Sequence, residues 1–350
     1  MGSEELNTSA ESRSHLKELL AIGVIASLIG IALGLAIDWF PTQASTEAET
    51  VDTVWDVLVI VSVPFFVLVM VVVLYSMWRF RMKPGEELKD GPPIHGNTRL
   101  EIIWTAVPAI ILVALCSYAY VALRDIEEAK ADAMEVRVVG EQFTWTFYYK
   151  DAAGKEFDSP QLYLPRGKPV FFVVQSLDVI HDFWVPAFRM KIDAVPGVST
   201  ELRVTPKTNG DFPVVCAELC GLGHSVMRQT AHVIDQAEFD SWMERRGAPE
   251  GGDEETGAGA GAPDGKAVFT DNGCGTCHAL ADAGTTGGTG PKLDESLTGK
   301  DEAYIERGIV DPSAEIADGF QDGLMPPNYE STLDPAELDA LVGYLAEVTD

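Results

Sequence analysis

Three long apolar runs without charged residues constrain this chain more than any other feature. Each has about the 20 residues that a helix needs to cross the hydrocarbon core of a bilayer. The runs are Leu19 to Ile37, Val57 to Trp78 and Ile102 to Leu123. We therefore expect a membrane anchor over residues 1–130, with helices near 19–39, 55–79 and 102–123, and the lipid bilayer as a partner.

The first apolar run allows two interpretations. Arg13 and Lys17 precede it, as basic residues precede a secretory signal peptide. Signal peptides have apolar stretches of only about 7–15 residues, however, and a small-residue cleavage site follows them. No A-x-A pattern follows this run. We favour a retained helix, and removal of the segment stays open.

Basic residues set the orientation in the membrane. The segment between the second and third runs carries Arg79, Arg81, Lys83, Lys89 and Arg99, whereas Asp38 to Asp56 has no lysine or arginine. Loops rich in lysine and arginine stay in the cytoplasm. The chain is therefore predicted to cross the membrane several times, with everything after Leu123 on the outer side.

The outer part divides by composition. Residues 131–246 hold short apolar runs broken by proline and glycine, a pattern typical of a β-sandwich or barrel. Residues 247–263 contain mostly glycine, alanine and acidic residues, which predicts a flexible acidic linker. Residues 264–350 show short helical patterns and form a further domain. The formal net charge of −29 excludes nucleic acid as a partner, because phosphate binding needs a basic face.

The last domain contains CGTCH, from Cys274 to His278. C-x-x-C-H is the attachment sequence of c-type haem, in which two thiols bind the haem and the histidine is an axial ligand of the iron. A redox C-x-x-C beside a chance histidine is the alternative. GPKL (290–293) and GLMPP (323–327) resemble loops of small cytochromes c, the second bearing the other axial ligand, Met325. The domain thus resembles an all-α class I cytochrome c.

Soft metal ligands gather in CAELCGLGHSVM, from Cys216 to Met227. Thiolate and thioether sulfurs together favour copper, and imidazoles complete its coordination. His224 is one imidazole, and His181 in LDVIHDFWVP is a second candidate. A Cys216–Cys220 disulfide and a zinc site completed by histidines remain alternatives.

These residues resemble the dinuclear copper site, CuA, in subunit II of the haem-copper cytochrome c oxidases. The resemblance implies that Cys216 and Cys220 bridge two copper ions and that His181 and His224 each bind one of them. It further implies that Met227 and the Glu218 carbonyl are weak axial ligands. The Glu218 side chain is then a candidate ligand for a magnesium ion shared with subunit I.

The resemblance extends along most of the chain. EIIWTAVPAIIL (101–112) is similar to the start of a membrane helix of subunit II, and KIDAVPG (191–197) also matches. The implied copper domain is a cupredoxin-like Greek-key β-sandwich. Glu101 is implied as a proton entry point into subunit I, although a glutamate at the end of a membrane helix can also simply extend to the interface.

One motif departs from the family pattern. The family reads G-H-Q-W-x-W where this chain reads GEQFTW (140–145), so Phe143 replaces the tryptophan at which electrons from an external cytochrome c enter. Trp145 remains a candidate for the electron path. Aromatic packing on a β-strand is the alternative for both residues.

The resemblance as a whole indicates a caa-type oxidase subunit II with a fused cytochrome c. It implies electron flow from a donor, a cytochrome c or a quinol:cytochrome c reductase, through haem c and CuA to subunit I. Subunit I would reduce oxygen to water and translocate protons, with subunit III as a further partner. A copper-delivery protein would have no use for the haem domain. A nitrous oxide reductase needs a histidine-rich domain, which the six histidines exclude.

Overall fold

The architecture is that of a computed structural model, which describes residues 2–82, 95–246, 263–327, 329–333 and 335–349. The chain forms two compact units, Met1–Pro41 with Glu49–Ile126, and Thr42–Ala48 with Glu127–Asp350. The predicted linker at 247–263 lies outside the described residues apart from Pro263, as do Lys83 and Lys89 of the basic segment.

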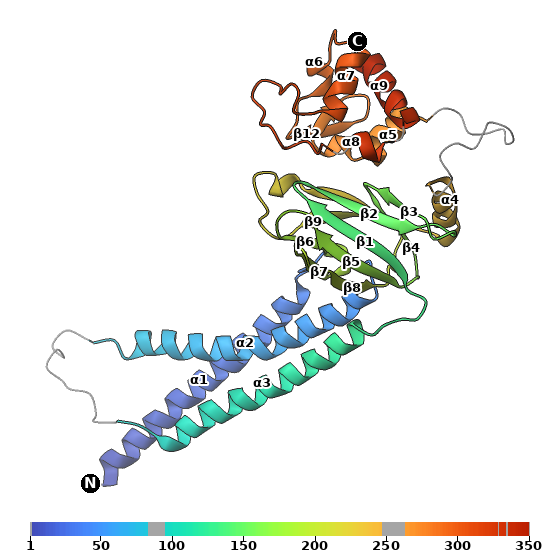
Figure 1. Cartoon of the computed structure of the whole chain (residues 1–350). Coiled ribbons are helices and arrows are strands. Elements are labelled where there is room, and N and C mark those ends of the chain that lie inside the picture. The colour runs from blue at the N-terminus through green and yellow to red at the C-terminus, as the bar shows by residue number, and fades with distance from the viewer. Residues whose placement is uncertain (1, 83–94, 247–262, 328, 334, 350) are drawn as a thin grey trace. The chain divides into compact units, whose positions relative to one another are not determined.

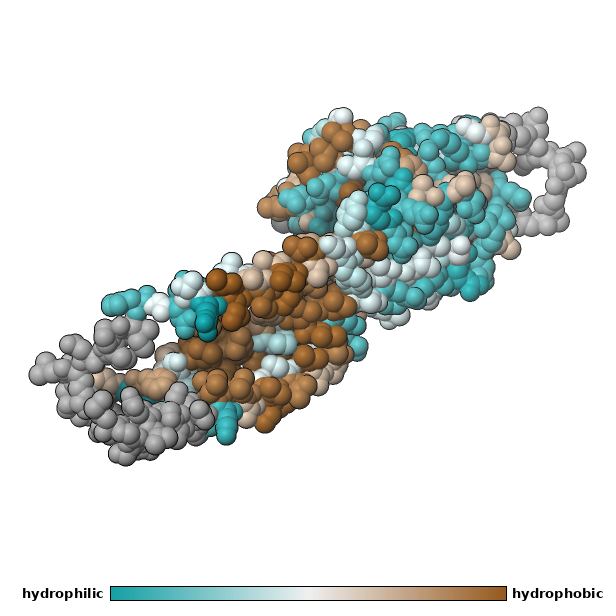
Figure 2. Space-filling view, turned by 90° about the horizontal axis from the view of Figure 1, so that it is seen from below, coloured by the Kyte–Doolittle hydropathy of each residue, from teal (hydrophilic) through white to brown (hydrophobic). Residues whose placement is uncertain are grey.

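Three helices make up the first unit: α1 (Gly2–Ala36), α2 (Glu47–Arg79) and α3 (Thr98–Ile126) (Figure 1). Each contains a stretch long and apolar enough to cross a membrane, and Figure 2 shows apolar side chains gathered over this unit. The prediction of three membrane-spanning helices is therefore confirmed by length and composition. Helix α2 begins at Glu47 rather than near residue 55, so the acidic segment before the apolar run is helical as well.

Small residues let α1 and α2 pack closely. A Cβ atom added to Gly30 would lie 2.8 Å from Val63 Cγ1, and one added to Gly34 would lie 2.7 Å from Val59 Cγ1. Small residues four positions apart allow membrane helices to approach in this way. The first apolar run is thus packed as a helix against the second.

The outer unit begins with a β-sandwich of two five-stranded sheets. The first sheet has the order β3-β2-β1-β5-β8, and the second has the order β4-β10-β9-β6-β7. The strands are β1 (Met134–Glu141), β2 (Thr144–Lys150), β3 (Glu156–Ser159), β4 (Leu162–Pro165), β5 (Val170–Ser176), β6 (His181–Val185), β7 (Met190–Ala194), β8 (Thr200–Val204), β9 (Gly210–Cys216) and β10 (Arg228–Ile234). The chain crosses repeatedly between the sheets, and α4 (Gln236–Arg246) ends this part, so the predicted sandwich is confirmed.

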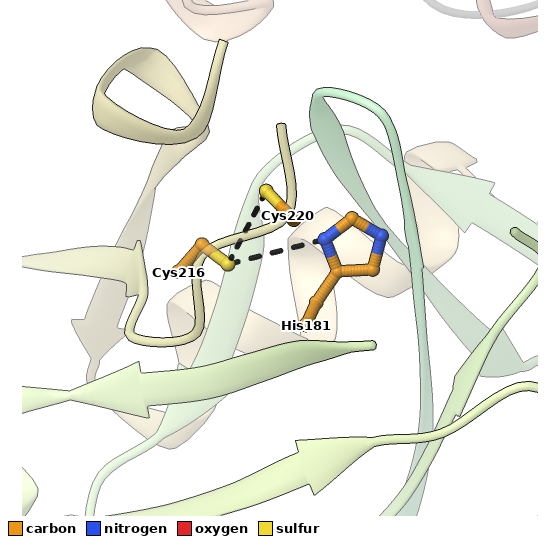
Figure 3. Close-up of side chains that lie close together, drawn as sticks. All are labelled: His181, Cys216 and Cys220. Atoms are coloured by element: carbon orange, nitrogen blue, oxygen red, sulfur yellow. Dashed lines mark hydrogen bonds between the residues drawn. The ribbon is translucent and has the colours of Figure 1, made fainter. Parts of the chain in front are cut away.

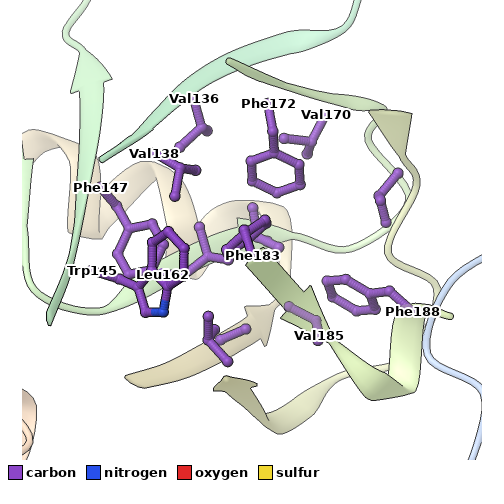
Figure 4. Packing of buried hydrophobic residues seen from close by; sticks show 14 of the residues in the cluster. Val136, Val138, Trp145, Phe147, Leu162, Val170, Phe172, Phe183, Val185 and Phe188 are labelled. Carbon is purple, nitrogen blue, oxygen red and sulfur yellow. The ribbon is translucent and has the colours of Figure 1, made fainter. Parts of the chain in front are cut away.

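The core of the sandwich follows from alternation along the strands. In β5, Val170, Phe172 and Val174 are buried while the residues between them are half-buried, as expected for a strand with one face on the core. Figure 4 shows Val170 and Phe172 among the aromatic and branched side chains that meet between the sheets. Cys216, Cys220 and Met227 belong to the same buried cluster, so three of the candidate copper ligands are part of the sandwich core.

A segment that the sequence places in the anchor packs on the sandwich instead. Thr42–Ala48 belongs to the outer unit. The backbone N–H of Ala44 donates to Ala187 O at 2.9 Å, and that of Thr46 donates to Thr205 O at 3.0 Å. Ala44 is fully buried in the core cluster. The short loop between α1 and α2 is therefore part of the sandwich.

The C-terminal part has its own hydrophobic core. It consists mainly of helices, α5 (Gly265–Asp271), α6 (Leu293–Ser296), α7 (Glu302–Val310), α8 (Tyr329–Thr332) and α9 (Pro335–Thr349). Phe269 of α5, Ile305 of α7 and Leu341 of α9 are buried together. The structure adds a small two-stranded sheet, β11 (His278–Leu280) with β12 (Thr285–Gly288), which the all-α expectation did not include.

Candidate copper and haem sites

Neighbouring strands of the second sheet bring the candidate copper ligands together. His181 is the first residue of β6 and Cys216 the last of β9, and the two strands pair with Phe183 opposite Cys216. The chain then turns through residues 217–223 into a short 3-10 helix, His224–Val226, before β10. Figure 3 shows the two thiols and the His181 ring converging at this end of the sandwich.

Every predicted donor atom lies within 3.9 Å of one of two sulfurs. The two Sγ atoms are 3.8 Å apart. Cys216 Sγ lies 3.9 Å from His181 Nδ1 and 3.1 Å from Glu218 O. Cys220 Sγ lies 3.6 Å from His224 Nδ1 and 3.9 Å from Met227 Sδ. Each sulfur thus has an imidazole nitrogen beside it, with a carbonyl oxygen near Cys216 and a thioether near Cys220.

The two thiols are free. All five cysteines are unpaired, and the Sγ separation of 3.8 Å is far above the roughly 2.05 Å of a disulfide bond. The disulfide alternative therefore does not describe this structure. Two cysteines and two histidines are a ligand set that zinc also accepts. The thioether of Met227, fully buried beside Cys220, is a soft ligand that suits copper better.

The two cysteines differ in acidity. Burial opposes ionisation of Cys216, but contacts with His181 and with the backbone at Asp182 and Glu218 lower its pKa to about 6. Burial and the neighbouring Cys216 raise the pKa of Cys220 to about 12. One thiol is therefore a thiolate at neutral pH, and the other must lose a proton to bind a metal as a thiolate.

Asp178 orients His181. The fully buried ring places Nε2 2.8 Å from Asp178 Oδ1 and turns Nδ1 toward Cys216. Burial lowers the pKa of His181, yet Cys216 and Asp178 outweigh burial and raise it. A carboxylate on one ring nitrogen commonly fixes the other nitrogen toward a metal. Asp178 was not among the residues predicted from the sequence, although its position three residues before His181 was a usable signal.

The backbone carbonyl and the side chain of Glu218 have different surroundings. Its carbonyl points at Cys216 Sγ, whereas its side chain is exposed. Among the described residues, the one grouping of His, Cys, Asp and Glu that could hold a metal is His181, Cys216 and Cys220, which excludes the Glu218 carboxylate. A magnesium ion at this side chain would need ligands from another chain.

Trp145 lies under the candidate copper site rather than at the surface. It is fully buried, and its ring centroid lies 5.9 Å from that of His181 in an edge-on arrangement. Phe143 is partly buried and packs on the loop that follows Cys220. Trp145 thus packs on strand β2 against a candidate ligand, whereas Phe143 lies in the turn between β1 and β2.

The candidate haem residues surround one cavity in the C-terminal part. The cavity has a volume of about 210 Å³, and its lining includes Cys274, Cys277, His278 and Met325. His278 Nδ1 donates to Pro291 O at 2.9 Å, since a carbonyl can only accept. This hydrogen bond leaves Nε2 as the ring nitrogen available to an iron. Burial lowers the pKa of His278, which keeps the ring neutral.

The thiols of this cavity suit covalent attachment. Burial raises the pKa of Cys274 to about 12 and also raises that of Cys277. Both are therefore neutral thiols facing an apolar space, which matches addition to haem vinyl groups. The donor set and the cavity fit a c-type haem.

Glu101 lies in the first turn of α3 and takes part in its N-terminal cap. Its Oε1 accepts from the backbone N–H of Asn97 at 3.1 Å, and Asn97 Oδ1 accepts from that of Leu100 at 3.2 Å. Reciprocal bonds of this kind satisfy the free N–H groups at a helix start. The structure thus gives Glu101 a local contact that was not predicted from the sequence.

Family comparisons divide the chain at similar places. Residues 31–121 match the family described as cytochrome C oxidase subunit II, transmembrane domain. Residues 160–234 match its periplasmic domain, and residues 262–349 match cytochrome c. These matches cover the helices, the sandwich and the C-terminal part in turn.

Similar proteins carry the same description. A cytochrome c oxidase subunit 2 of Alkalihalophilus pseudofirmus is 31% identical over 305 residues, covering 83% of both chains. One of Synechocystis sp. is 31% identical over 271 residues, covering 64% of this chain and 80% of its own. The solved periplasmic domain of subunit II from Bradyrhizobium japonicum is 34% identical, with a TM-score of 0.32, and covers 34% of this chain and 96% of that one.

Proposed function

The chain belongs to the cytochrome c oxidase subunit 2 family, and we propose that it is the electron-transfer subunit of a respiratory oxidase, with a CuA centre and a covalent haem c. When bound, these groups supply one-electron chemistry that passes electrons from a donor to subunit I, where oxygen is reduced. The chain's own part is to hold and orient the two groups.

One observation supports the copper proposal. The two thiols lie close together, and two imidazoles, a thioether and a carbonyl each lie within 3.9 Å of one of the two sulfurs. Cys216 and Cys220, whose Sγ atoms are 3.8 Å apart, would both hold the two copper ions. His181 and His224 would each bind one of those ions, with Met227 and the Glu218 carbonyl as weaker ligands. Soft sulfur ligands with imidazole select copper over harder metals.

The haem proposal rests on the C-terminal cavity. Cys274 and Cys277 would hold the haem covalently, and His278 and Met325 would be the axial ligands. His/Met ligation raises the reduction potential of an iron centre, as an electron carrier in an oxidising chain requires. The hydrogen bond to Pro291 O fixes the His278 ring for this role.

We further propose that the chain lies in a prokaryotic cell membrane with both sites on the outer side. The three apolar helices and the match to a periplasmic domain support this location. The chain's partners would be subunits I and III, and its donor a cytochrome c or a quinol:cytochrome c reductase. Glu101 as a proton entry point, Trp145 as part of the electron path and magnesium at the Glu218 side chain remain proposals that need the assembled enzyme.

Metal and haem content of the purified full-length chain tests the proposal. We expect two coppers per chain, negligible zinc, and a haem that stays attached after denaturation. Stoichiometric zinc, or a haem that denaturation releases, would contradict it. A Met227→Leu variant should still bind copper, but with an altered absorption spectrum. If the site binds zinc instead, this substitution should leave metal binding unchanged.

A further inference from the structure

The turn that joins β1 to β2 contacts both chain segments that carry candidate copper ligands. Gln142 and Phe143 form this turn, which no ligand assignment includes. One set of contacts runs toward His181, and the other runs toward the loop between Cys220 and His224. The turn therefore connects parts of the chain that are far apart in sequence.

The first connection passes through Asp178. The backbone N–H of Gln142 donates to Asp178 Oδ2 at 2.7 Å. The other carboxylate oxygen, Oδ1, lies 2.8 Å from His181 Nε2. A shift of the turn would move this carboxylate and, with it, the His181 ring.

The second connection is a side-chain hydrogen bond to the copper loop. Gln142 Nε2 donates to Cys220 O at 2.6 Å. Gly221 follows with a φ of +135°, which side chains rarely adopt, and a Cβ there would lie 2.8 Å from Gln142 Nε2. The amide thus fixes the backbone just after the second cysteine.

The Phe143 ring completes the contact by packing closely on Gly221 and Gly223. A Cβ on Gly221 would lie 3.1 Å from Phe143 Cζ, and a Cβ on Gly223 would lie 2.5 Å from Phe143 Cγ. Gly221 O in turn accepts from the backbone N–H of His224 at 3.2 Å. The ring therefore supports the two glycines that lead into the turn bearing His224.

We propose that Gln142 and Phe143 act as a clamp that sets the spacing between His181 and the Cys220–His224 loop and so retains the copper. Both are positioning residues, because neither would touch the metal. The inference rests on the proposed copper-binding function. The clamp gives Phe143 a positioning role, whereas the tryptophan that it replaces in the family pattern is the site of electron entry. Partners that orient ligands commonly affect metal affinity by about 10–100-fold.

The test measures the rate at which the copper-loaded full-length chain releases copper to a high-affinity chelator. Loss of the thiolate–copper absorption reports the release. Phe143→Ala should speed release by about 10–100-fold. Gln142→Ala should speed it by a smaller factor, because the ring contact remains. Leu222→Ala is the control: this exposed side chain lies in the same loop and should release copper at the wild-type rate.

A double substitution tests whether the Phe143 ring acts through Gly223. Gly223→Ala alone should speed release, because its methyl group collides with the ring. In the Phe143→Ala background that methyl enters vacated space, so the double variant should release copper no faster than Phe143→Ala. If the two effects instead multiply, the ring does not act on Gly223 and the clamp is wrong.

A core variant and thermal unfolding of the copper-free chain distinguish loss of the clamp from general destabilisation of the sandwich. Phe147→Ala truncates a buried side chain of β2, the strand that follows the turn. It should lower the copper-free Tm more than Phe143→Ala while affecting release less. Equal release rates in these two variants, or a wild-type rate in Phe143→Ala, would overturn the clamp alone. A wild-type chain that binds no copper would overturn the proposed function and the clamp with it.

Discussion

The Sγ atoms of Cys216 and Cys220 lie 3.8 Å apart, and each lies within 3.9 Å of an imidazole nitrogen. The thiols are too far apart for a disulfide and close enough to share metal ions. The strand end at Cys216 and the turn after Cys220 hold this separation, so the pair is preorganised by the β-sandwich.

Copper binding should depend steeply on pH. Because burial and Cys216 raise the pKa of Cys220 to about 12, binding must displace its proton. Cys216, with a pKa of about 6, is already ionised. The apparent copper affinity should therefore rise about tenfold per pH unit between about pH 7 and pH 9. Competition with a chelator of known pH dependence measures this slope, and a flat profile would show that Cys220 is not a thiolate ligand.

Met325 should control the haem potential without controlling attachment. Met325→Ala should leave the haem bound through Cys274 and Cys277, and lower its potential by on the order of 0.2 V, a fraction of the ~0.8 V that axial ligands span. Leu324→Ala, which also lines the cavity, is the matched control and should change the potential little. Redox titration of the haem absorption provides the measurement. An unchanged potential in Met325→Ala would exclude Met325 as the axial ligand.

Lys191 should stabilise the sandwich by balancing the buried Asp182. The Lys191 Nζ atom lies 2.7 Å from Asp182 Oδ2, and the Asp182 side chain is only 3% exposed. Removing the cation leaves a buried charge, so Lys191→Met should cost about 1–3 kcal/mol of unfolding free energy at neutral pH. Asp182→Asn in the same chain should recover most of the loss, as measured by thermal unfolding without copper.

The same pair predicts a pH dependence with a definite sign. Burial raises the pKa of Asp182 above its usual 3.8 and Lys191 only partly opposes this, with Asp193 adding to the rise. A raised carboxyl pKa means that stability falls as pH rises through that pKa. Without Lys191 the pKa rises further, so the penalty of Lys191→Met should be small near pH 4 and full at neutral pH. A penalty that grows toward acid would show that Asp182 is not the partner that matters.

Glu101 offers two roles that substitution can separate. Its carboxylate accepts from the backbone N–H of Asn97 at the start of α3. Glu101→Gln keeps an acceptor and removes the charge, whereas Glu101→Ala removes both and should cost the helix about 0.5–2 kcal/mol. If Glu101 is a proton entry point, both variants should slow proton-coupled oxygen reduction in the assembled oxidase. If only Glu101→Ala is impaired, the residue acts as a cap.

Local sequence patterns predicted the main elements of the fold and most of the candidate site. Contacts between residues far apart in the sequence could not be predicted in this way. The three apolar runs predicted the helices, and the short apolar runs of residues 131–246 predicted the β-sandwich. The cysteines of Cys216 to Met227 are neighbours in sequence, so their grouping was visible before folding. Gln142 escaped notice because its partners, Asp178 and the backbone of Cys220, are 36 and 78 residues away in the sequence.

Non-local contacts also account for the short segment Thr42–Ala48. Its sequence reads as a polar loop between two membrane helices, and nothing in it predicts burial. It joins the sandwich through hydrogen bonds to residues more than 100 positions away, such as Ser45 Oγ to Phe188 O at 3.1 Å, with a sequence separation of 143. Only the fold reveals such a contact.

The most direct test of the dinuclear copper site is electron paramagnetic resonance of the oxidised, copper-loaded full-length chain. If Cys216 and Cys220 bridge two copper ions, one unpaired electron is shared and the hyperfine pattern is that of two equivalent nuclei. Cys220→Ser should destroy this pattern, whereas Cys116→Ser, at an exposed cysteine of α3, should preserve it. A spectrum of a single copper nucleus in the wild-type chain, or a shared-electron pattern that survives in Cys220→Ser, would contradict the dinuclear site.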